Sequence, residues 1–163
     1  FKSALSGKAF ILSATFRLAK GNYNPDISYG NLSEKLQGSP ILTPIIVRRA
    51  VIATRNEKIP DPKALGNAGS FFKNPEISEQ AAQRLGSDFP QIKQFRQPDG
   101  KVKIPAGQLI DLCGFKQAPD ANVGVAPCNA LIITNLGNAT GKEVLAFAKK
   151  IQKAVKEKFK KQA

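Results

Sequence analysis

The chain has 163 residues, of which 42% are apolar and 23% are charged, as in globular proteins with a core of their own. Its 25 lysines and arginines outnumber 12 acidic residues, so the formal charge of +13 favours anionic partners such as nucleic acid or a diphosphate-bearing nucleotide. The lack of histidine excludes a Ser-His-Asp triad, and no apolar run is long enough to span a membrane. Cys113 and Cys128 match no metal spacing, so we expect free thiols, and without a recognisable secretory signal we expect a cytoplasmic protein.

The first third of the chain predicts one strand and one helix. Residues 8–18, KAFILSATFRL, alternate imperfectly and are rich in β-branched and aromatic types, which is typical of a strand. After a turn-rich stretch, Thr43 as N-cap and Pro44 at the first helical position predict the start of a helix. We expect this helix to end near Lys58, because the prolines that follow favour an extended connector.

The rest of the chain alternates short helices and strands. We predict a glycine-rich loop at 66–70 and a turn followed by a strand within 97–104. Two short helices are predicted, at 78–85 stopped by Gly86 and at 106–113 ended by Gly114. A buried strand is predicted at 130–134. Thr140 and Glu143 form a capping box at the start of the last helix. Its apolar stripe consists of Val144, Phe147, Ala148, Ile151, Val155 and Phe159. The fold class is therefore α+β.

The segment GNAGSFFKNP (66–75) is the main candidate for chemistry. Gly66 and Gly69 allow a close approach of the backbone to a ligand, so Ser70 would present its hydroxyl on a constrained turn. Phe71 and Phe72 are adjacent, so in an extended segment we expect them to point in opposite directions, into two cores. Lys73 and Asn74 could meet phosphate oxygens. The alternative is a glycine-rich loop with two phenylalanine anchors and no chemical role.

The flanking sequence extends this motif into a family resemblance. The chain carries, in order, FRLAK (16–20), SYGNL (28–32), KIPDPKALGNAGSFFKNPEIS (58–78), KIPAGQLIDLCGFK (103–116) and ALIITNLGNATGKEVLAFAKKIQKAVKEKF (130–159). In these blocks it resembles the C-terminal part of UDP-N-acetylenolpyruvoylglucosamine reductases, the MurB family, in their type I form. The resemblance implies the tail of an FAD-binding domain at 1–59. It further implies a substrate-binding domain at 60–163, with a small sheet covered by helices.

The resemblance also implies an activity and a set of site residues. In the family, NADPH reduces FAD, and the flavin reduces UDP-N-acetylglucosamine enolpyruvate for peptidoglycan synthesis. Ser70 matches the serine that protonates the substrate carbon. Substrate contacts are implied for Lys58, Arg55, Asn74, Lys116 and Asn129. Asn129 replaces a longer glutamine or glutamate, and Gln117 and Ala126 are further departures from the family pattern.

The family's flavin site and a catalytic glutamate lie in sequence that this chain does not contain. We therefore expect little or no turnover from the isolated chain, and we expect the N-terminal FAD-binding part of the same enzyme as its partner. Two other readings stay open: a basic module that binds nucleic acid, and a domain that binds a UDP-sugar without catalysis. Selective binding of UDP-N-acetylglucosamine derivatives would separate the reductase reading from salt-dependent binding to arbitrary DNA.

Overall fold

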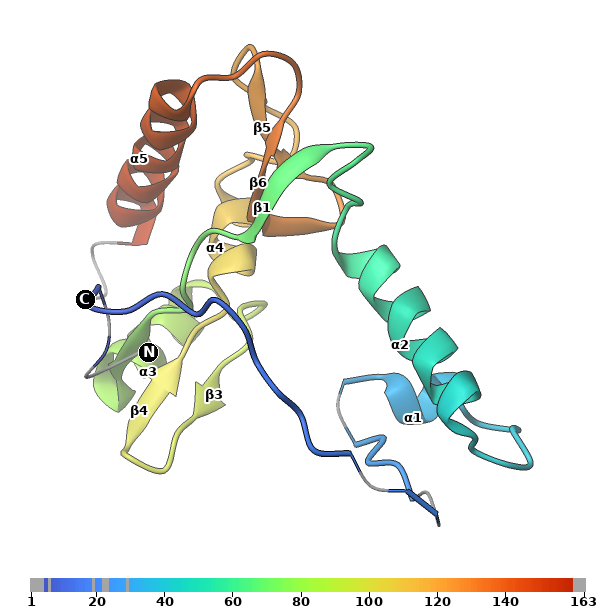
Figure 1. Cartoon of the computed structure of the whole chain (residues 1–163). Coiled ribbons are helices and arrows are strands. Elements are labelled where there is room, and N and C mark those ends of the chain that lie inside the picture. The colour runs from blue at the N-terminus through green and yellow to red at the C-terminus, as the bar shows by residue number, and fades with distance from the viewer. Residues whose placement is uncertain (1–4, 6, 19, 22–23, 29, 160–163) are drawn as a thin grey trace. The chain divides into compact units, whose positions relative to one another are not determined.

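The computed structural model of the chain describes residues 5, 7–18, 20–21, 24–28 and 30–159 (Figure 1). Contacts divide the chain into two units, Phe1–Val51 and Ile52–Ala163. The helix α2 (Pro44–Lys58) crosses this division. Both FRLAK and SYGNL contain residues outside the described ones, Ala19 and Tyr29.

The first unit has a small apolar cluster around two helices. Helix α1 (Leu32–Lys35) and the first turns of α2 bury Leu32, Leu36 and Val47 against one another. Thr43 caps α2 as predicted, since its hydroxyl oxygen accepts a hydrogen bond from the N–H of Ile46 at 3.3 Å. The predicted end of this helix at Lys58 is confirmed.

The predicted strand at 8–18 is wrong. These residues form no strand in the structure, and the side chains of Phe10 and Leu12 are 94% and 96% exposed. The alternating pattern is present, but a strand needs a neighbour that accepts its backbone hydrogen bonds and covers its apolar face. No described strand pairs with this segment, so its preference for extended structure does not lead to a strand.

The second unit contains two antiparallel three-stranded sheets. In the first, β6 (Asn129–Asn135) lies between β1 (Gly66–Ser70) and β5 (Val123–Ala126) (Figure 1). In the second, β4 (Lys101–Lys103) lies between β2 (Glu76–Ser78) and β3 (Phe95–Arg96). The predicted strands at 130–134 and within 97–104 are confirmed. The other four strands were not predicted.

Three helices complete the second unit: α3 (Glu79–Asp88), α4 (Ala106–Leu112) and α5 (Gly141–Phe159). The prediction that Gly86 stops α3 is wrong, because the helix continues to Asp88. A side chain at Gly86 would place its Cβ 2.9 Å from the amide nitrogen of Gln94, which donates to the carbonyl oxygen of Ala82 at 2.7 Å. Glycine at this position leaves room for the Gln94 amide and does not stop the helix.

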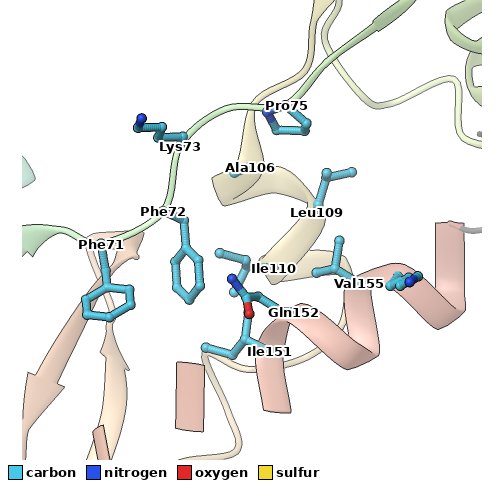
Figure 2. A pocket seen from close by; sticks show the side chains of 11 residues that line it. Phe71, Phe72, Lys73, Pro75, Ala106, Leu109, Ile110, Ile151, Gln152 and Val155 are labelled. Carbon is cyan, nitrogen blue, oxygen red and sulfur yellow. The ribbon is translucent and has the colours of Figure 1, made fainter. Parts of the chain in front are cut away.

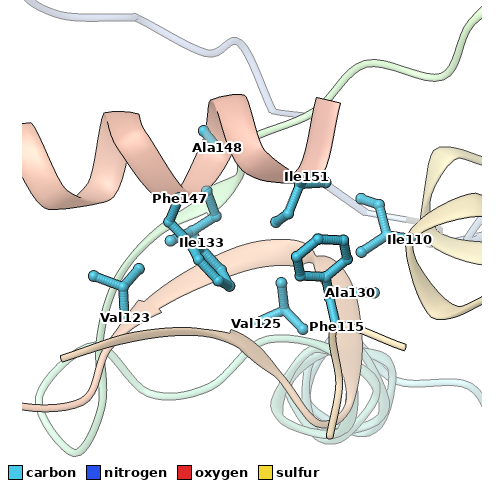
Figure 3. Packing of buried hydrophobic residues seen from close by; sticks show 9 residues of the cluster. All are labelled: Ile110, Phe115, Val123, Val125, Ala130, Ile133, Phe147, Ala148 and Ile151. Atoms are coloured by element: carbon cyan, nitrogen blue, oxygen red, sulfur yellow. The ribbon is translucent and has the colours of Figure 1, made fainter. Parts of the chain in front are cut away.

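Helix α5 covers the first sheet and makes the main core (Figure 3). Phe147 and Ile151 point from the helix toward Val125 and Ile133 of the sheet, and Ala148 is buried in the same cluster. Phe115 packs into the same cluster, with its ring 5.8 Å from that of Phe147 in an edge-to-face arrangement. The sequence-predicted apolar stripe of the last helix is thus confirmed as its packing face.

The start of α5 is fixed by the predicted capping box. The carboxylate of Glu143 accepts hydrogen bonds from the N–H and the hydroxyl of Thr140, both at 2.7 Å, and the N–H of Glu143 donates back to that hydroxyl at 3.3 Å. These bonds lower the pKa of Glu143 from its ordinary value. Both cysteines are free thiols, as expected. Among the described residues, no helix is long and apolar enough to cross a bilayer.

Candidate functional site

Ser70 ends an edge strand that contains a bulge. On β1, Asn67 faces Thr134 and Ser70 faces Ile132, so three steps along β1 match two along β6. Gly69 lies inside this bulge with φ at +72°, in the left-handed region that glycine adopts without strain. The prediction of a loop at 66–70 is therefore wrong. The segment is a strand, and its bulge gives Ser70 an exposed position at the end.

The two phenylalanines after Ser70 do not enter two separate cores. Their ring centroids lie 5.3 Å apart at an interplanar angle of 62°, and both line one cavity of about 540 Å³ (Figure 2). This corrects the prediction that they point in opposite directions. The N–H of Phe71 still donates to the carbonyl oxygen of Leu131 at 2.7 Å, so the backbone remains tied to β6 just beyond Ser70.

The cavity is an apolar space between the segment after β1 and two helices. Leu109 and Ile110 line it from α4, and Ile151 and Val155 line it from α5 (Figure 2). Lys73 and Lys156 bring positive charge to the lining, and neither forms an ion pair with a described residue. None of the six sequence-predicted site residues lines it, so its size alone does not identify it as the place of the predicted chemistry.

Lys58 and Arg55 lie in the last turn of α2. Arg55 lines a second cavity of about 300 Å³ together with Pro60 and Asp61. The carboxyl end of a helix carries partial negative charge, which stabilises these two cations but does not attract an anion. An anionic ligand at this place would be held by the side chains themselves.

Asn129 joins the end of α2 to β6. Its amide nitrogen donates to the carbonyl oxygen of Lys58 at 3.5 Å, and its amide oxygen accepts from the N–H of Leu131 at 3.1 Å. Ser70 faces Ile132 on the same strand, three residues from Asn129 and about 10 Å along it. The structure therefore brings Ser70, Lys58 and Asn129 to one region of the first sheet.

Asn74 and Lys116 already have structural partners. The amide oxygen of Asn74 accepts from the N–H of Ala106 at 2.9 Å, which satisfies a free donor at the start of α4. Lys116 pairs with Asp111 across 3.0 Å in the turn after α4. No described contact connects Lys116 with Ser70 or Lys58, so this residue is not joined to the others.

Asn67 was missed by sequence reasoning. Its side chain hydrogen-bonds to Pro60, Leu65 and Gly69, and so connects the segment after Lys58 with the bulge before Ser70. The available signal was an asparagine two residues before a glycine, a spacing at which asparagine side chains commonly bind the backbone two residues on. A metal centre has no support among the described residues, where no three acidic, cysteine or histidine side chains cluster.

Comparison with known proteins gives one consistent match. A sequence model described as "UDP-N-acetylenolpyruvoylglucosamine reductase, C-terminal domain" matches residues 61–162. The chain is similar to proteins named UDP-N-acetylenolpyruvoylglucosamine reductase from Chromobacterium violaceum (43% identity over 161 residues), Flavobacterium johnsoniae (40% over 161) and Burkholderia multivorans (43% over 163). In each case 98% of this chain is covered, but only 46–48% of the relative, so the chain spans about half the length of these proteins.

Proposed function

Since this chain belongs to the family of UDP-N-acetylenolpyruvoylglucosamine reductases, we propose that it forms the substrate-binding part of such an enzyme. The whole enzyme would use NADPH and FAD to reduce UDP-N-acetylglucosamine enolpyruvate during peptidoglycan synthesis in the cytoplasm. The observation that carries this proposal is the match of 98% of the chain to proteins of that name at 40–43% identity. The net charge of +13 supports it, because the substrate carries a diphosphate and a carboxylate.

Reduction of the enolpyruvyl double bond requires one hydride and one proton, and we assign the proton to Ser70. A serine hydroxyl is a weak acid, so it is useful only toward a strongly basic carbon such as the one left after hydride addition. The hydroxyl must then be held within about 3 Å of that carbon. The position of Ser70 supports this role, because the side chain is exposed while its backbone is paired with β6.

The diphosphate of the substrate would be bound by two cations in the last turn of α2. We assign the diphosphate to Lys58 and Arg55, whose side chains can donate charge-assisted hydrogen bonds to phosphate oxygens. Asn74 would contact the nucleotide through its amide nitrogen, since its amide oxygen is bonded to Ala106. Lys116 and Asn129 remain weaker assignments, because the polar groups of both already bind the protein.

We infer that the described residues do not form a complete flavin site by themselves. The cavity beside α5 is lined mainly by apolar side chains, and within the described residues it offers neither a glycine-rich phosphate loop nor a carboxylate for a ribose. We therefore propose that FAD is bound mainly by sequence outside this chain. For the same reason we expect the isolated chain to bind the substrate with little or no turnover.

The test is a Ser70→Ala substitution in the full-length enzyme that carries this chain. Substrate affinity should change less than about threefold, while turnover should fall by about 100-fold or more, the usual contribution of a positioned proton donor. Ser87→Ala is the matched control, because Ser87 is an exposed serine whose hydroxyl donates to the carbonyl oxygen of Gln83 within α3. Unchanged turnover in Ser70→Ala would remove Ser70 from the mechanism.

A further inference from the structure

Asn67 makes side-chain hydrogen bonds in two directions from within the bulge of β1. Its amide nitrogen donates to the carbonyl oxygens of Leu65 at 2.8 Å and Pro60 at 3.2 Å. Its amide oxygen accepts from the N–H of Gly69 at 3.1 Å. The half-buried side chain thus uses both its donor and its acceptor capacity on backbone groups.

The bond to Gly69 holds the backbone directly before Ser70. Gly69 has φ at +72°, but glycine populates positive and negative φ with similar ease and does not fix this value by itself. The Asn67 oxygen and the pairing of β1 with β6 select it. A rotation at Gly69 would displace the Ser70 hydroxyl, so Asn67 limits where that hydroxyl can lie.

The bond to Pro60 holds the segment that follows α2. Pro60 lies two residues after Lys58 and, as a proline, has no N–H with which to anchor itself. Its carbonyl oxygen is bonded to Asn67 on β1, while the carbonyl oxygen of Lys58 is bonded to Asn129 on β6. The end of α2 is thereby attached to the sheet at two points.

We propose that Asn67 is a positioning residue that sets the separation between the Ser70 hydroxyl and the Lys58 ammonium. The inference rests on the proposed function, which assigns proton donation to Ser70 and anion binding to Lys58. One substrate molecule would have to meet both groups at once. A misplacement of about 1 Å between a bound substrate and a catalytic group lowers the rate by about 100-fold, so the separation matters for turnover more than for affinity.

The chemistry of the side chain indicates a discriminating substitution. Asn67→Asp keeps an acceptor for Gly69 but turns the donor into an anionic oxygen that faces the carbonyl oxygens of Pro60 and Leu65. Those dipoles and the partial burial would raise the pKa of the new carboxyl, while the hydrogen bond from the N–H of Gly69 opposes this rise. Once protonated, the carboxyl can donate to one of the two carbonyls again. Asn67→Ala can regain no hydrogen bond at any pH.

The experiment measures kcat and KM of the full-length enzyme carrying this chain between about pH 5 and pH 8. We expect kcat of Asn67→Ala to fall by about 100-fold with a much smaller rise in KM. The kcat of Asn67→Asp, divided by that of the wild type, should rise as the pH falls, while the same ratio for Asn67→Ala stays flat. Asn138→Asp, an exposed asparagine before α5, controls for the added negative charge.

A second measurement does not depend on turnover. In the isotope-labelled 163-residue chain, the amide resonance of Gly69 should move in Asn67→Ala and should move back toward the wild-type position in protonated Asn67→Asp. If Asn67→Ala fails to fold, Asn67→Ser keeps one polar group and should show an intermediate loss of kcat. Wild-type kcat in both Asn67 variants, or a fall in kcat without the pH-dependent recovery in Asn67→Asp, overturns the positioning role and leaves the proposed function intact. A wild-type enzyme that does not reduce the substrate overturns both.

Discussion

The two cysteines have different surroundings, although both are free thiols. Cys113 follows α4 and packs against the main core, and its burial raises the pKa of the thiol, an effect that the charge of Lys158 partly opposes. Cys128 is exposed in the turn between β5 and β6, directly before Asn129. The thiolate is the reactive form of cysteine. The partial burial of Cys113 and its raised thiol pKa should therefore make it less reactive than the exposed Cys128.

Alkylation with iodoacetamide should therefore modify Cys128 first. At pH 7 we expect Cys113 to react at least about tenfold more slowly, because a raised pKa leaves less thiolate and the side chain is partly covered. Its rate should keep rising as the pH is raised above the ordinary thiol pKa. Peptide mass spectrometry over time gives both rates. The slow reaction of Cys113 is attributed to its own burial and not to Cys128. Faster labelling of Cys113 in a Cys128→Ser variant would contradict this explanation.

Amide side chains show how far sequence reasoning reaches at the residue scale. The motif identified Ser70 as the candidate catalytic residue, and in the structure this residue lies at the exposed end of a strand. It did not show that Asn74 binds Ala106, because that partner lies 32 positions away and only the tertiary fold brings it near. The partners of Asn67 lie within seven positions, so local turn chemistry could have revealed them.

At the scale of elements, Gly86 lowers the intrinsic stability of α3 but allows a hydrogen bond to the helix from outside it. Glycine in a helix is about 1 kcal/mol less favourable than alanine. Here the missing methyl group leaves room for the Gln94 amide, which bonds to the carbonyl of Ala82. A hydrogen bond of this kind contributes about 1 kcal/mol, so the two effects are of equal size.

Gly86→Ala should consequently leave the free energy of unfolding within about 0.5 kcal/mol of the wild type, because the gain in helix propensity is offset by loss of the Gln94 bond. In a Gln94→Ala background the same substitution should stabilise by about 1 kcal/mol, because no side chain is left to displace. Urea denaturation of the two single variants and the double variant completes the cycle. If Gly86→Ala stabilised the wild type by the full amount of about 1 kcal/mol, the Gln94 side chain would have moved aside without any cost in free energy.

Helices were predicted better than strands for a physical reason. An amphipathic helix such as α5 repeats its apolar positions over five turns and carries its own capping box, so its sequence contains most of the needed information. Strands of two or three residues, such as β2 and β3, are too short to show a period. The glycine-rich β1 lacks strand propensity altogether and exists because β6 supplies its hydrogen bonds.

At the scale of the whole molecule, the two units differ in how much of their surface is covered. The second unit has two apolar clusters and two sheets, whereas residues 8–18 of the first unit expose several large apolar side chains. These are Phe10, Ile11, Leu12, Phe16 and Leu18. The α+β class was predictable from the sequence. The strand pattern of residues 8–18 could not show whether a partner strand is present.

Brief treatment of the chain with trypsin should cut at Arg17 well before it cuts at Lys103. Arg17 lies in an exposed segment without regular structure, while Lys103 is paired with Glu76 in a sheet. We expect Arg17 to be cleaved at least about tenfold faster, with the products identified by mass spectrometry. Slow cleavage at Arg17 would mean that this segment is covered in solution, for instance by a second copy of the chain.

The bulged strand that carries Ser70 also has a consequence for the order in which the protein folds. Hairpin partners β5 and β6 are neighbours in the chain, but β1 must wait for β6, which is made after β2, α3 and α4. Contacts between distant segments form late, because closing a long loop costs entropy. On the ribosome, the serine is therefore synthesised early but acquires its neighbours only near the end, so a nascent chain cannot hold a finished site before β6 has emerged.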